Sequence, residues 1–335
     1  KIAEVSRHRS RFKLDNYGIL ETRRYLDDPS AAIQTGSLKI SEHEAVKLLK
    51  ILIKEMKPRT KLALFSVPSF SVFVTVLDMP AMTPQDTDKA VMFQARQFIP
   101  LQISEVSIDW SKIDEYESNR GTRNQRILLV GIPNELIETY KRIARGAGLR
   151  LVFLELDSFA LARAFNNAAN NSPYLVVDMG GEATTASVVE GLALRYSGNL
   201  DKGGLYLTQA LTRSLGISTP RAEDLKRKKG LLGKGGELEL STLMLGFLDV
   251  IIEEVTKIKS LYEERYGKKI QRFTITGGGA NLAGFSQYFA DASQLEVYSP
   301  QIFADVVYDT KLQPIERQLQ NDLAIAVGLA KKYFN

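Results

Sequence analysis

Two segments of the chain run from apolar residues directly into a cluster of glycines. They read LVVDMGGEATTAS at 175–187 and FTITGGGANLAGF at 273–285. Glycine lets the backbone approach a ligand closely, and the amides of such a turn can hold phosphate oxygens. Neither segment has the GxGxxG spacing or that of GxxxxGK, and GLLGKGG at 230–236 does not have it either. The Rossmann and P-loop classes are therefore not favoured, and both turns are candidates for an anion site of another class.

The composition excludes several other kinds of site. The 335 residues contain no cysteine and only two histidines, His8 and His43, both in polar surroundings. A thiol nucleophile and a cysteine zinc site are excluded, and a histidine-built metal site is not favoured. With 44% hydrophobic and 25% charged residues, and no long apolar run, the chain is typical of a soluble globular protein without a membrane-spanning helix. The net charge of +5 comes partly from KRKKGLLGKGG at 226–236, where no aromatic residue interleaves for base stacking, so we expect no nucleic-acid partner.

Strands and helices alternate along the chain, which predicts an α/β fold. A helix is expected from the capping box at Ser41 and Glu44 to Pro58, followed by a buried strand, LALFSV, at 62–67. Before them, the pattern predicts short strands separated by a turn at Asp15-Asn16. Those strands are expected at 2–6, 11–14 and 17–22.

Residues 69–152 follow a different pattern. Val72 and Val74 belong to an alternating segment, which predicts a half-buried strand, and Thr83 before Pro84 predicts the start of a helix. Two further strands, and a helix capped by Asn134, complete a compact α+β unit. We interpret this unit as an inserted subdomain.

The second half is expected to repeat strands, glycine turns and helices. A buried strand that runs into glycines is predicted at 174–181, and further strands at 184–190 and 193–198. Residues 272–285 are predicted to form a strand, a glycine turn and a helix, and helices are expected at 158–168, 204–215, 242–266 and 319–333.

The order of these pieces resembles the actin-like ATPase superfamily, which includes actin, sugar kinases, chaperone ATPases and the division protein FtsA. The pieces are DMGGEATTAS at 178–187, a Gly-Gly pair at 203–204 that opens a helix, RAEDLKR at 221–227, TGGGAN at 276–281 and AIAVGLA at 324–330. The resemblance implies two lobes with a nucleotide cleft between them, ATP as the ligand and Mg²⁺ as its counter-ion.

Within this superfamily the first half is similar to the pilus-assembly PilM family. The similar segments are SVPSFSVFVTVLDMP at 66–80, RQFIPL at 96–101, ILLVGIPNELIETY at 127–140 and ELDSFALARAF at 155–165. The resemblance implies a first-lobe core of residues 1–68, 153–172 and 310–335, with the inserted subdomain at 69–152. It implies a second-lobe core of residues 173–217 and 268–309, with a smaller subdomain at 218–267.

The resemblance also implies roles for single residues. Asp178 would hold Mg²⁺ through water or assist the attacking water. Asp157 matches the acid that positions water, and a cap of the following helix is its alternative role. Glu223 and Lys226 match the pair that contacts the ribose, with a surface ion pair as the alternative. The other candidates for nucleotide contact are Lys1, the phosphate turn with Gly180, Gly181 and Thr184, the pair Gly203 and Gly204, and the adenine turn with Gly277, Gly278 and Gly279.

One departure from the superfamily concerns its first phosphate hairpin, Asp-x-Gly followed by small hydroxyl residues and a lysine. The printed sequence opens with KIAEV, which matches only the end of that hairpin. If no Asp-x-Gly precedes it, we expect the binding of Mg²⁺ and triphosphate to be severely weakened.

The function favoured by the resemblance is an ATP-binding scaffold of type IV pilus assembly, with at most slow ATPase activity. It would be cytoplasmic and held at the inner membrane only through a partner. That partner is the N-terminal cytoplasmic peptide of an inner-membrane pilus protein (PilN-like), which would dock beside Val72 and Val74. Contacts with the pilus motor or other assembly components, and self-association, are also open.

Two alternative functions stay open. An FtsA-like division protein would carry a C-terminal amphipathic membrane helix, whereas the printed sequence ends directly after the last predicted helix. A sugar- or acetate-kinase-like enzyme would need a general base beside the γ-phosphate, and the sequence contains no polar cluster for it beyond the shared turns.

Overall fold

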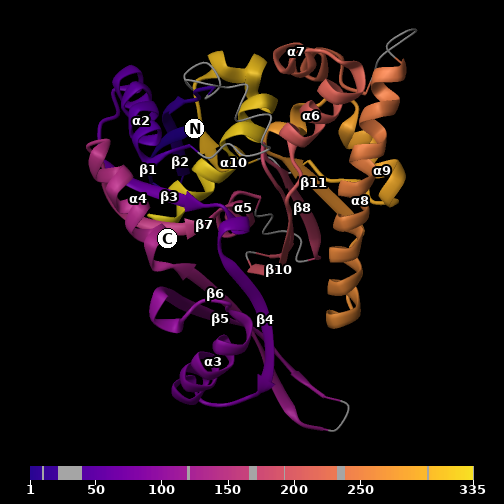
Figure 1. Cartoon of the computed structure of the whole chain (residues 1–335). Helices are drawn as coiled ribbons and strands as arrows, with labels where there is room; N and C mark the ends of the chain where they lie inside the picture. Colours follow the sequence, from indigo (N-terminus) through magenta and orange to yellow (C-terminus); the bar gives the residue numbers. More distant parts are fainter. Residues whose placement is uncertain are drawn as a thin grey trace.

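The computed structural model describes residues 1–9, 11–21, 40–118, 121–165, 172–191, 193–231, 238–299 and 302–334. Within these residues the architecture is mixed α/β, with four sheets and helices packed on their faces (Figure 1). None of the described helices is both long and apolar enough to cross a bilayer.

A five-stranded sheet in the order β10-β9-β8-β11-β12 is the centre of what we call the second lobe. Its strands are β8 (Tyr174–Met179), β9 (Thr184–Glu190), β10 (Ala193–Leu200), β11 (Arg272–Thr276) and β12 (Glu296–Val297). The helices around it are α5 (Asp157–Ala164), α6 (Gly204–Leu215), α7 (Thr219–Lys229), α8 (Leu238–Tyr266), α9 (Phe285–Ser293) and α10 (Glu316–Lys332). Successive residues of β8 point to opposite faces. Leu175 and Val177 therefore pack against α6, α8 and α9, whereas Tyr174 and Val176 pack against α5 and α10.

Two smaller sheets belong to what we call the first lobe. One contains β1 (Ile2–His8), β2 (Arg11–Gly18) and β13 (Val306–Val307), and in the other β3 (Leu62–Val67) pairs in parallel with β7 (Arg150–Leu156). The helices here are α2 (Glu42–Met56), which begins at the predicted capping box of Ser41 and Glu44, and α4 (Asn134–Gly146). Because β13 pairs with β2, the chain returns to the first lobe before residue 310, earlier than expected.

Between β3 and β7 the chain forms a separate antiparallel sheet, which we call the insert. Its strands are β4 (Phe73–Pro80), β5 (Val106–Glu117) and β6 (Arg123–Pro133), in the order β4-β6-β5. Helix α3 (Pro84–Phe98) begins where predicted, because the Thr83 hydroxyl accepts a hydrogen bond from the Asp86 N–H. Val91 and Ala95 of α3 pack on the sheet and give the insert a small core of its own. Short 3₁₀ helices occur at η2 (Ser69–Ser71), η3 (Ile103–Glu105), η5 (Gly278–Asn281) and η6 (Thr310–Ile315).

Helices α5 and α10 cross between the two lobes with their backbones in close contact. A Cβ atom added to Gly328 of α10 would overlap the carbonyl oxygen of Ala160 in α5. The Arg163 guanidinium donates to the Gly328 carbonyl oxygen at 2.7 Å and pairs with Glu155 at the same distance. Only glycine at position 328 allows this approach.

Most expected elements are confirmed, but three local expectations are wrong. Asp15-Asn16 is no turn; it lies inside β2 at a β-bulge, and the chain turns between His8 and Arg11 instead. The strand expected from about residue 70 begins only at Phe73, because Ser69–Ser71 form a 3₁₀ turn. Asn134 does not cap α4, since its side chain bonds to Ser104 and Ser107. The parts of the expected loop and helix at 232–236 and 166–168 lie outside the described residues.

We expect Gly328→Ala to destabilise the protein by about 2–3 kcal/mol, because the added methyl group must push α5 and α10 apart. Gly246→Ala is the matched control, because Gly246 is an exposed helix glycine of α8 with nothing within 4 Å of an added Cβ. That change should stabilise the protein by roughly 0.5–1 kcal/mol. Chemical denaturation of both variants measures the difference, and equal effects would show that the crossing is not tight.

Candidate functional site

The two glycine turns lie side by side because the strands before them pair in parallel. Asp178 of β8 is opposite Thr276 of β11, so both strands end at the same edge of the sheet. The second turn begins at Gly277, whose φ is +78°. A side chain at Gly277 would overlap the Asp178 carboxylate. Glycine is therefore required here both for the backbone conformation and for the contact between the turns.

The first turn also holds the N-terminus of α6. The backbone N–H groups of Gly204 and Leu205 donate to the carbonyl oxygens of Gly180 and Gly181, each at 2.9 Å. A Cβ atom at Gly203 would lie 2.6 Å from the Gly181 carbonyl oxygen. Gly203 therefore allows α6 to pack on the turn.

Glu223 and Lys226 of α7 form an ion pair in which the Lys226 Nζ atom lies 2.7 Å from the Glu223 carboxylate. The Lys226 ammonium also donates to Thr208 Oγ1 at 2.8 Å and to the Gly204 carbonyl oxygen at 2.7 Å. Glu223 is 5% exposed and Lys226 is 8% exposed, so the alternative of a surface ion pair is wrong. Thr208 was not predicted, because only the fold brings α6 beside α7.

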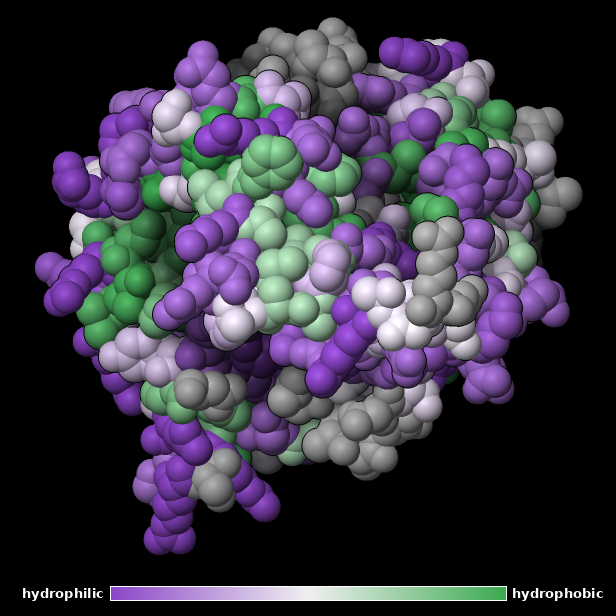
Figure 2. All heavy atoms as spheres, turned by 90° about the horizontal axis from the view of Figure 1, so that it is seen from below, coloured by the Kyte–Doolittle hydropathy of each residue, from purple (hydrophilic) through white to green (hydrophobic). Residues whose placement is uncertain are grey.

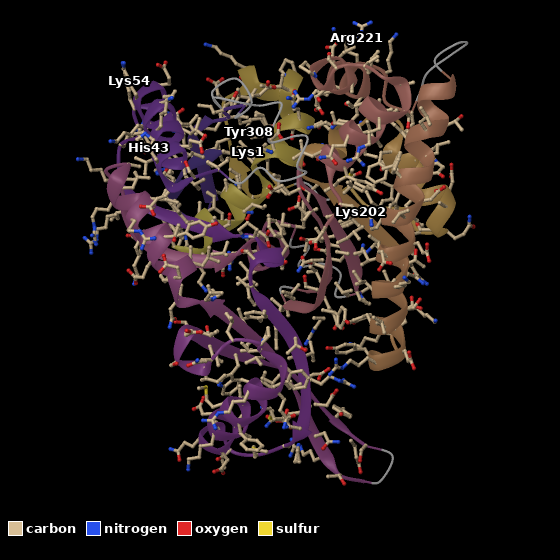
Figure 3. All side chains as sticks on the ribbon, viewed as in Figure 1. Lys1, His43, Lys54, Lys202, Arg221 and Tyr308 are labelled. Atoms are coloured by element: carbon tan, nitrogen blue, oxygen red, sulfur yellow. The ribbon has the colours of Figure 1, made fainter. Side chains whose placement is uncertain are left out.

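Helix α10 brings polar groups to the other side of the turns. Lys1 Nζ lies 2.7 Å from Asp322 Oδ1, and the Asn321 side chain donates to Asn281 of η5 at 3.1 Å. Figure 3 shows Lys1 near α10, whereas His43 lies out on α2. Asp322 and Asn321 were not predicted, because in the sequence they are ordinary polar positions of an amphipathic helix.

The turns, α7 and α10 surround one cleft of about 2020 Å³. Arg227 of α7 pairs with Glu21, which follows β2, at 3.0 Å, so an ion pair joins the second lobe to the first beside this cleft. The predicted nucleotide contacts that line it are Lys1, Asp178, Gly180, Gly181, Gly204, Glu223, Lys226, Gly277, Gly278 and Gly279.

Three predicted residues do not line the cleft: Gly203, Thr184 and Asp157. The Thr184 hydroxyl donates to the Lys202 carbonyl oxygen at 2.7 Å and so supports the base of the first turn. The Asp157 carboxylate is buried and accepts hydrogen bonds from the backbone N–H groups of Ser69 and Ser158. Burial raises the pKa of Asp157, although these hydrogen bonds act in the opposite direction.

Val74, which was expected to lie beside a peptide groove, is half-buried in the structure. Val74 of β4 packs with Val76, Leu128 and Leu194, in an apolar cluster that joins the insert to β10 of the second lobe. Val72 directly follows the 3₁₀ turn and is half-buried. Alternation predicts correctly that one side of this segment is covered, but not what covers it.

Part of the cleft is a slot between two sheet edges. In the described residues β1 pairs only with β2, and β3 pairs only with β7. Every residue from Lys1 to Arg7 and every residue from Leu62 to Ser66 lines the cavity. A strand that presented one face would contribute alternate residues, so β1 and β3 present their edges. An unpaired strand edge can accept a further strand.

Comparison with known proteins identifies the family. The family model for type IV pilus assembly protein PilM matches residues 1–334. The chain belongs to this family. The solved structure of a PilM-PilN type IV pilus biogenesis complex is similar over 99% of this chain and 95% of that chain, at 20% identity and a TM-score of 0.78. MreB 5 of Spiroplasma citri bound to AMPPNP is similar over 89% of this chain and 76% of that chain, at 16% identity and a TM-score of 0.51. These likenesses confirm the predicted actin-like fold.

Curated relatives of this PilM-family chain are cell division proteins FtsA. The protein from Helicobacter pylori is 28% identical over 134 residues, which cover 39% of this chain and 27% of the relative. The protein from Enterococcus faecalis is 25% identical over 246 residues, which cover 63% of this chain and 55% of the relative. The chain thus spans between about a quarter and about half of the length of these relatives.

Asp178 is the acidic side chain that lies where the two turns of this PilM-family cleft meet. Burial and, to a smaller extent, the Asp157 carboxylate raise its pKa to about 7, although Lys1 acts to lower it. No group of three or more acidic or histidine side chains in the described residues could hold a metal ion by itself. Mg²⁺ binds through one or two carboxylates, with water and phosphate oxygens as its other ligands. A single aspartate therefore fits a magnesium ion that is carried by a nucleotide.

We expect Asp178→Asn to stabilise the ligand-free protein more at pH 8 than at pH 5. The pKa of about 7 in the folded state exceeds the unfolded value near 4, so folding takes up a proton. The wild-type protein therefore loses stability as the pH rises from about 4 through 7. The variant has no carboxyl group at this position, so it does not show this loss of stability. The expected difference between pH 5 and pH 8 is on the order of 2–3 kcal/mol.

Denaturation at pH 5, 6.5 and 8 measures this difference, with Asp201→Asn as a control at an exposed carboxylate outside the cleft. A gain in stability that is the same at every pH would contradict the raised pKa.

Proposed function

We propose that this PilM-family chain binds ATP in the cleft and that ATP acts there as a conformational ligand in type IV pilus assembly. The observation that carries the proposal is the meeting of two glycine turns around Asp178, between two lobes. The N–H groups of such turns can hold phosphate oxygens. MreB 5 of Spiroplasma citri, which shares the fold, has been solved with AMPPNP and with ADP.

The geometry supports a role for each group that lines the cleft. We assign Gly180 and Gly181 to the phosphates and the turn at Gly278 to the adenine. Glu223 and Lys226 lie on the cleft wall, where the pair fits a ribose. Bound Mg²⁺ would neutralise phosphate charge, and Asp178 would hold it through water. Thr184 and Gly203 support the first turn from behind.

The slot between β1 and β3 extends this proposal. Its two unpaired edges fit one additional strand, and Lys1 lies among the residues that line the slot near the glycine turns. We propose that the other strand of the superfamily's first hairpin, which carries its Asp-x-Gly, lies in the slot beside β1 and completes the phosphate site. Only the remaining part of the cavity would then hold the nucleotide.

The position of Asp157 favours slow hydrolysis. An acid that activates water must reach the γ-phosphate with a free carboxylate oxygen. Asp157 is buried outside the cleft, and Ser69 and Ser158 both donate hydrogen bonds to its carboxylate. ATP would therefore act mainly through binding, for which a difference of roughly 1–3 kcal/mol between two conformations suffices.

We expect Gly278→Val to weaken the binding of Mg-ATP to the full-length protein at least tenfold, or about 1.4 kcal/mol. An added Cβ at Gly278 meets no atom within 4 Å, so the valine would extend into the cleft without disturbing the fold. Gly246→Val places the same side chain on the exposed face of α8 and should leave affinity unchanged. Calorimetry measures both, and normal binding by a folded Gly278→Val protein would show that the turn is only a connection.

We also propose that the chain binds the cytoplasmic N-terminal peptide of a PilN-type membrane protein. The similar solved structure is a complex of PilM with PilN. Phe70 of η2 lies where the chain enters the insert, Phe153 lies on β7 of the first lobe, and each is 42% exposed. Figure 2 shows that apolar side chains are exposed on the underside of the molecule, among hydrophilic ones. Apolar anchors of this kind are needed, because ordering a flexible peptide costs roughly 2–5 kcal/mol.

We expect Phe70→Asp and Phe153→Asp each to weaken binding of a synthetic PilN-type tail peptide at least tenfold, because a carboxylate cannot replace the apolar contact. Binding of Mg-ATP should not change. Leu261→Asp is the control, because Leu261 is 50% exposed on α8, away from the junction of insert and first lobe. Fluorescence anisotropy measures the affinities, and full peptide binding by both phenylalanine variants would contradict this docking site.

The proposed partner also determines where the protein acts. A peptide tethered to the inner membrane would hold the protein at its cytoplasmic face, with no direct contact with lipid. If the protein instead binds vesicles of anionic phospholipid strongly and ignores the peptide, the FtsA-like function should replace this one.

A further inference from the structure

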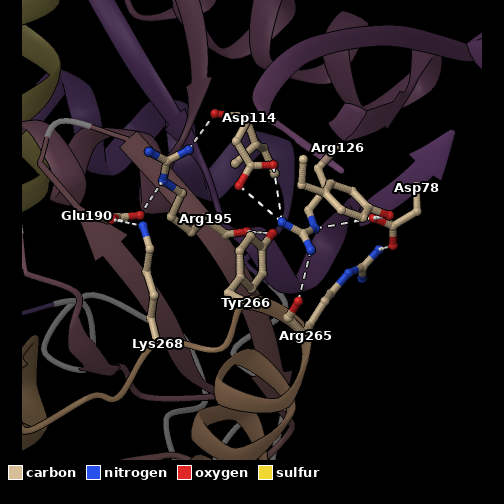
Figure 4. Close-up of polar contacts among 10 residues, drawn as sticks. Asp78, Asp114, Arg126, Glu190, Arg195, Arg265, Tyr266 and Lys268 are labelled. Atoms are coloured by element: carbon tan, nitrogen blue, oxygen red, sulfur yellow. Dashed lines mark hydrogen bonds and ion pairs between the residues drawn. The ribbon is translucent and has the colours of Figure 1, made fainter. Parts of the chain in front are cut away.

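The insert is connected to the first lobe by the chain, yet it is bound to the second lobe by side chains. Figure 4 shows the centre of this contact, where the guanidinium of Arg126, on β6, meets residues at the end of α8. Arg126 is 9% exposed, although it carries a full charge. A buried guanidinium requires paired charges and hydrogen bonds, so its surroundings must be specific.

Aromatic rings lie on the two sides of this guanidinium. Its central carbon is 3.9 Å from the ring centre of Tyr116, in the insert, and 4.5 Å from that of Tyr266, in α8. Arg126 pairs with Asp78 and Asp114, each at 3.2 Å, and donates to the Arg265 carbonyl oxygen at 2.9 Å. The insert supplies both carboxylates, whereas α8 supplies one ring and one carbonyl oxygen. Arg126 can therefore satisfy all these contacts only when the insert lies against α8.

Two more arginines connect the same parts. Arg265 of α8 donates to the Val76 carbonyl oxygen of β4 at 2.8 Å and to the Asp78 carboxylate. Arg195 of β10 donates to the Ile113 carbonyl oxygen of β5 at 2.5 Å and pairs with Glu190 of β9 at 3.0 Å. We call Arg126, Arg195 and Arg265, with the groups that they contact, the arginine clasp.

A continuous set of contacts leads from the glycine turns to the clasp. The first turn holds the start of α6 through the Leu205 N–H group, and Tyr206 of α6 packs edge-to-face on Phe247 of α8 at 5.2 Å. Helix α8 ends with Arg265 and Tyr266 in the clasp. A ligand that displaces the first turn would therefore displace a rigid helix whose far end is fixed to the insert.

We propose that the arginine clasp makes the insert move with the second lobe, and not with the first lobe that it interrupts in sequence. The second lobe would then carry the insert along when the angle between the lobes changes. The groove between insert and first lobe would open or close with it. Together with the proposed function, this couples nucleotide binding to peptide binding. The clasp itself depends on neither ligand.

Distances between spin labels test the clasp directly, and the absence of cysteine allows labels to be placed at chosen sites. One pair joins the insert to the second lobe, at Lys89→Cys and Glu253→Cys, and the other joins the insert to the first lobe, at Lys89→Cys and Lys50→Cys. All three positions are exposed on helices. We expect a narrower distance distribution for the first pair than for the second. A broader distribution for the first pair would overturn the proposal.

Arg126→Met should at least double the width of the first distribution. Arg142→Met is the matched control, because Arg142 pairs with Glu42 and Glu135, both outside the insert and the second lobe. If the Arg126→Met protein does not fold, Arg265→Met is the second variant. It removes other contacts of the same clasp, and Arg265 is more exposed than Arg126. An unchanged width in a folded clasp variant would overturn the proposal.

The coupling is tested by the affinity of the PilN-type peptide with and without Mg-ATP. We expect at least a threefold difference in the wild-type protein and less than a 1.5-fold difference in the clasp variant. If the wild-type protein bound neither Mg-ATP nor the peptide, the proposed function would be contradicted. The spin-label distances would still test whether the clasp holds the insert to the second lobe. If Mg-ATP changed the peptide affinity equally in the wild-type protein and the clasp variant, only the proposed coupling would be overturned.

Discussion

The crossing of α5 and α10 at Ala160 and Gly328 determines how the two lobes face each other. The close backbone contact leaves no room for sliding, and Arg163 ties it further through the Gly328 carbonyl oxygen. Helix α10 also carries Asp322, which pairs with Lys1 beside the glycine turns. The same helix thus defines the hinge and one wall of the cleft. The polar contacts of the cleft would change together if this crossing moved.

Two ionisable groups, Asp178 and Arg126, illustrate different physical solutions. Burial raises the pKa of Asp178 to about 7, although Lys1 acts to lower it. Arg126 lies between two aromatic rings and two carboxylates and keeps its charge. The first arrangement is unfavourable until a cation arrives, which is typical of a binding site. The second is paired within the protein, which is typical of a structural contact.

The sequence predicts well whatever depends on neighbours along the chain. The α2 capping box and the start of α6 follow from local rules, and the meeting of the glycine turns follows from the parallel pairing of β8 and β11. Asp15-Asn16 was predicted as a turn because these residue types favour turns, but the pairing of β1 with β2 holds them in a strand at a bulge. Val74 and Arg126 were beyond prediction, because their partners lie in β10 and α8. Burial against such distant segments leaves no signal in local periodicity.

The insert also bears on how such a protein could change during evolution. Phe73, where β4 begins, is opposite Gly131 near the end of β6, so the insert leaves and re-enters the first lobe at neighbouring strands. A segment with neighbouring ends can be gained, lost or exchanged without cutting the core around it. The clasp restricts this freedom, because Arg126 contacts a carbonyl oxygen 139 residues further along the chain. Recombination between relatives would thus have to exchange the insert and the end of α8 together, whereas the exposed face of α3 could diverge alone.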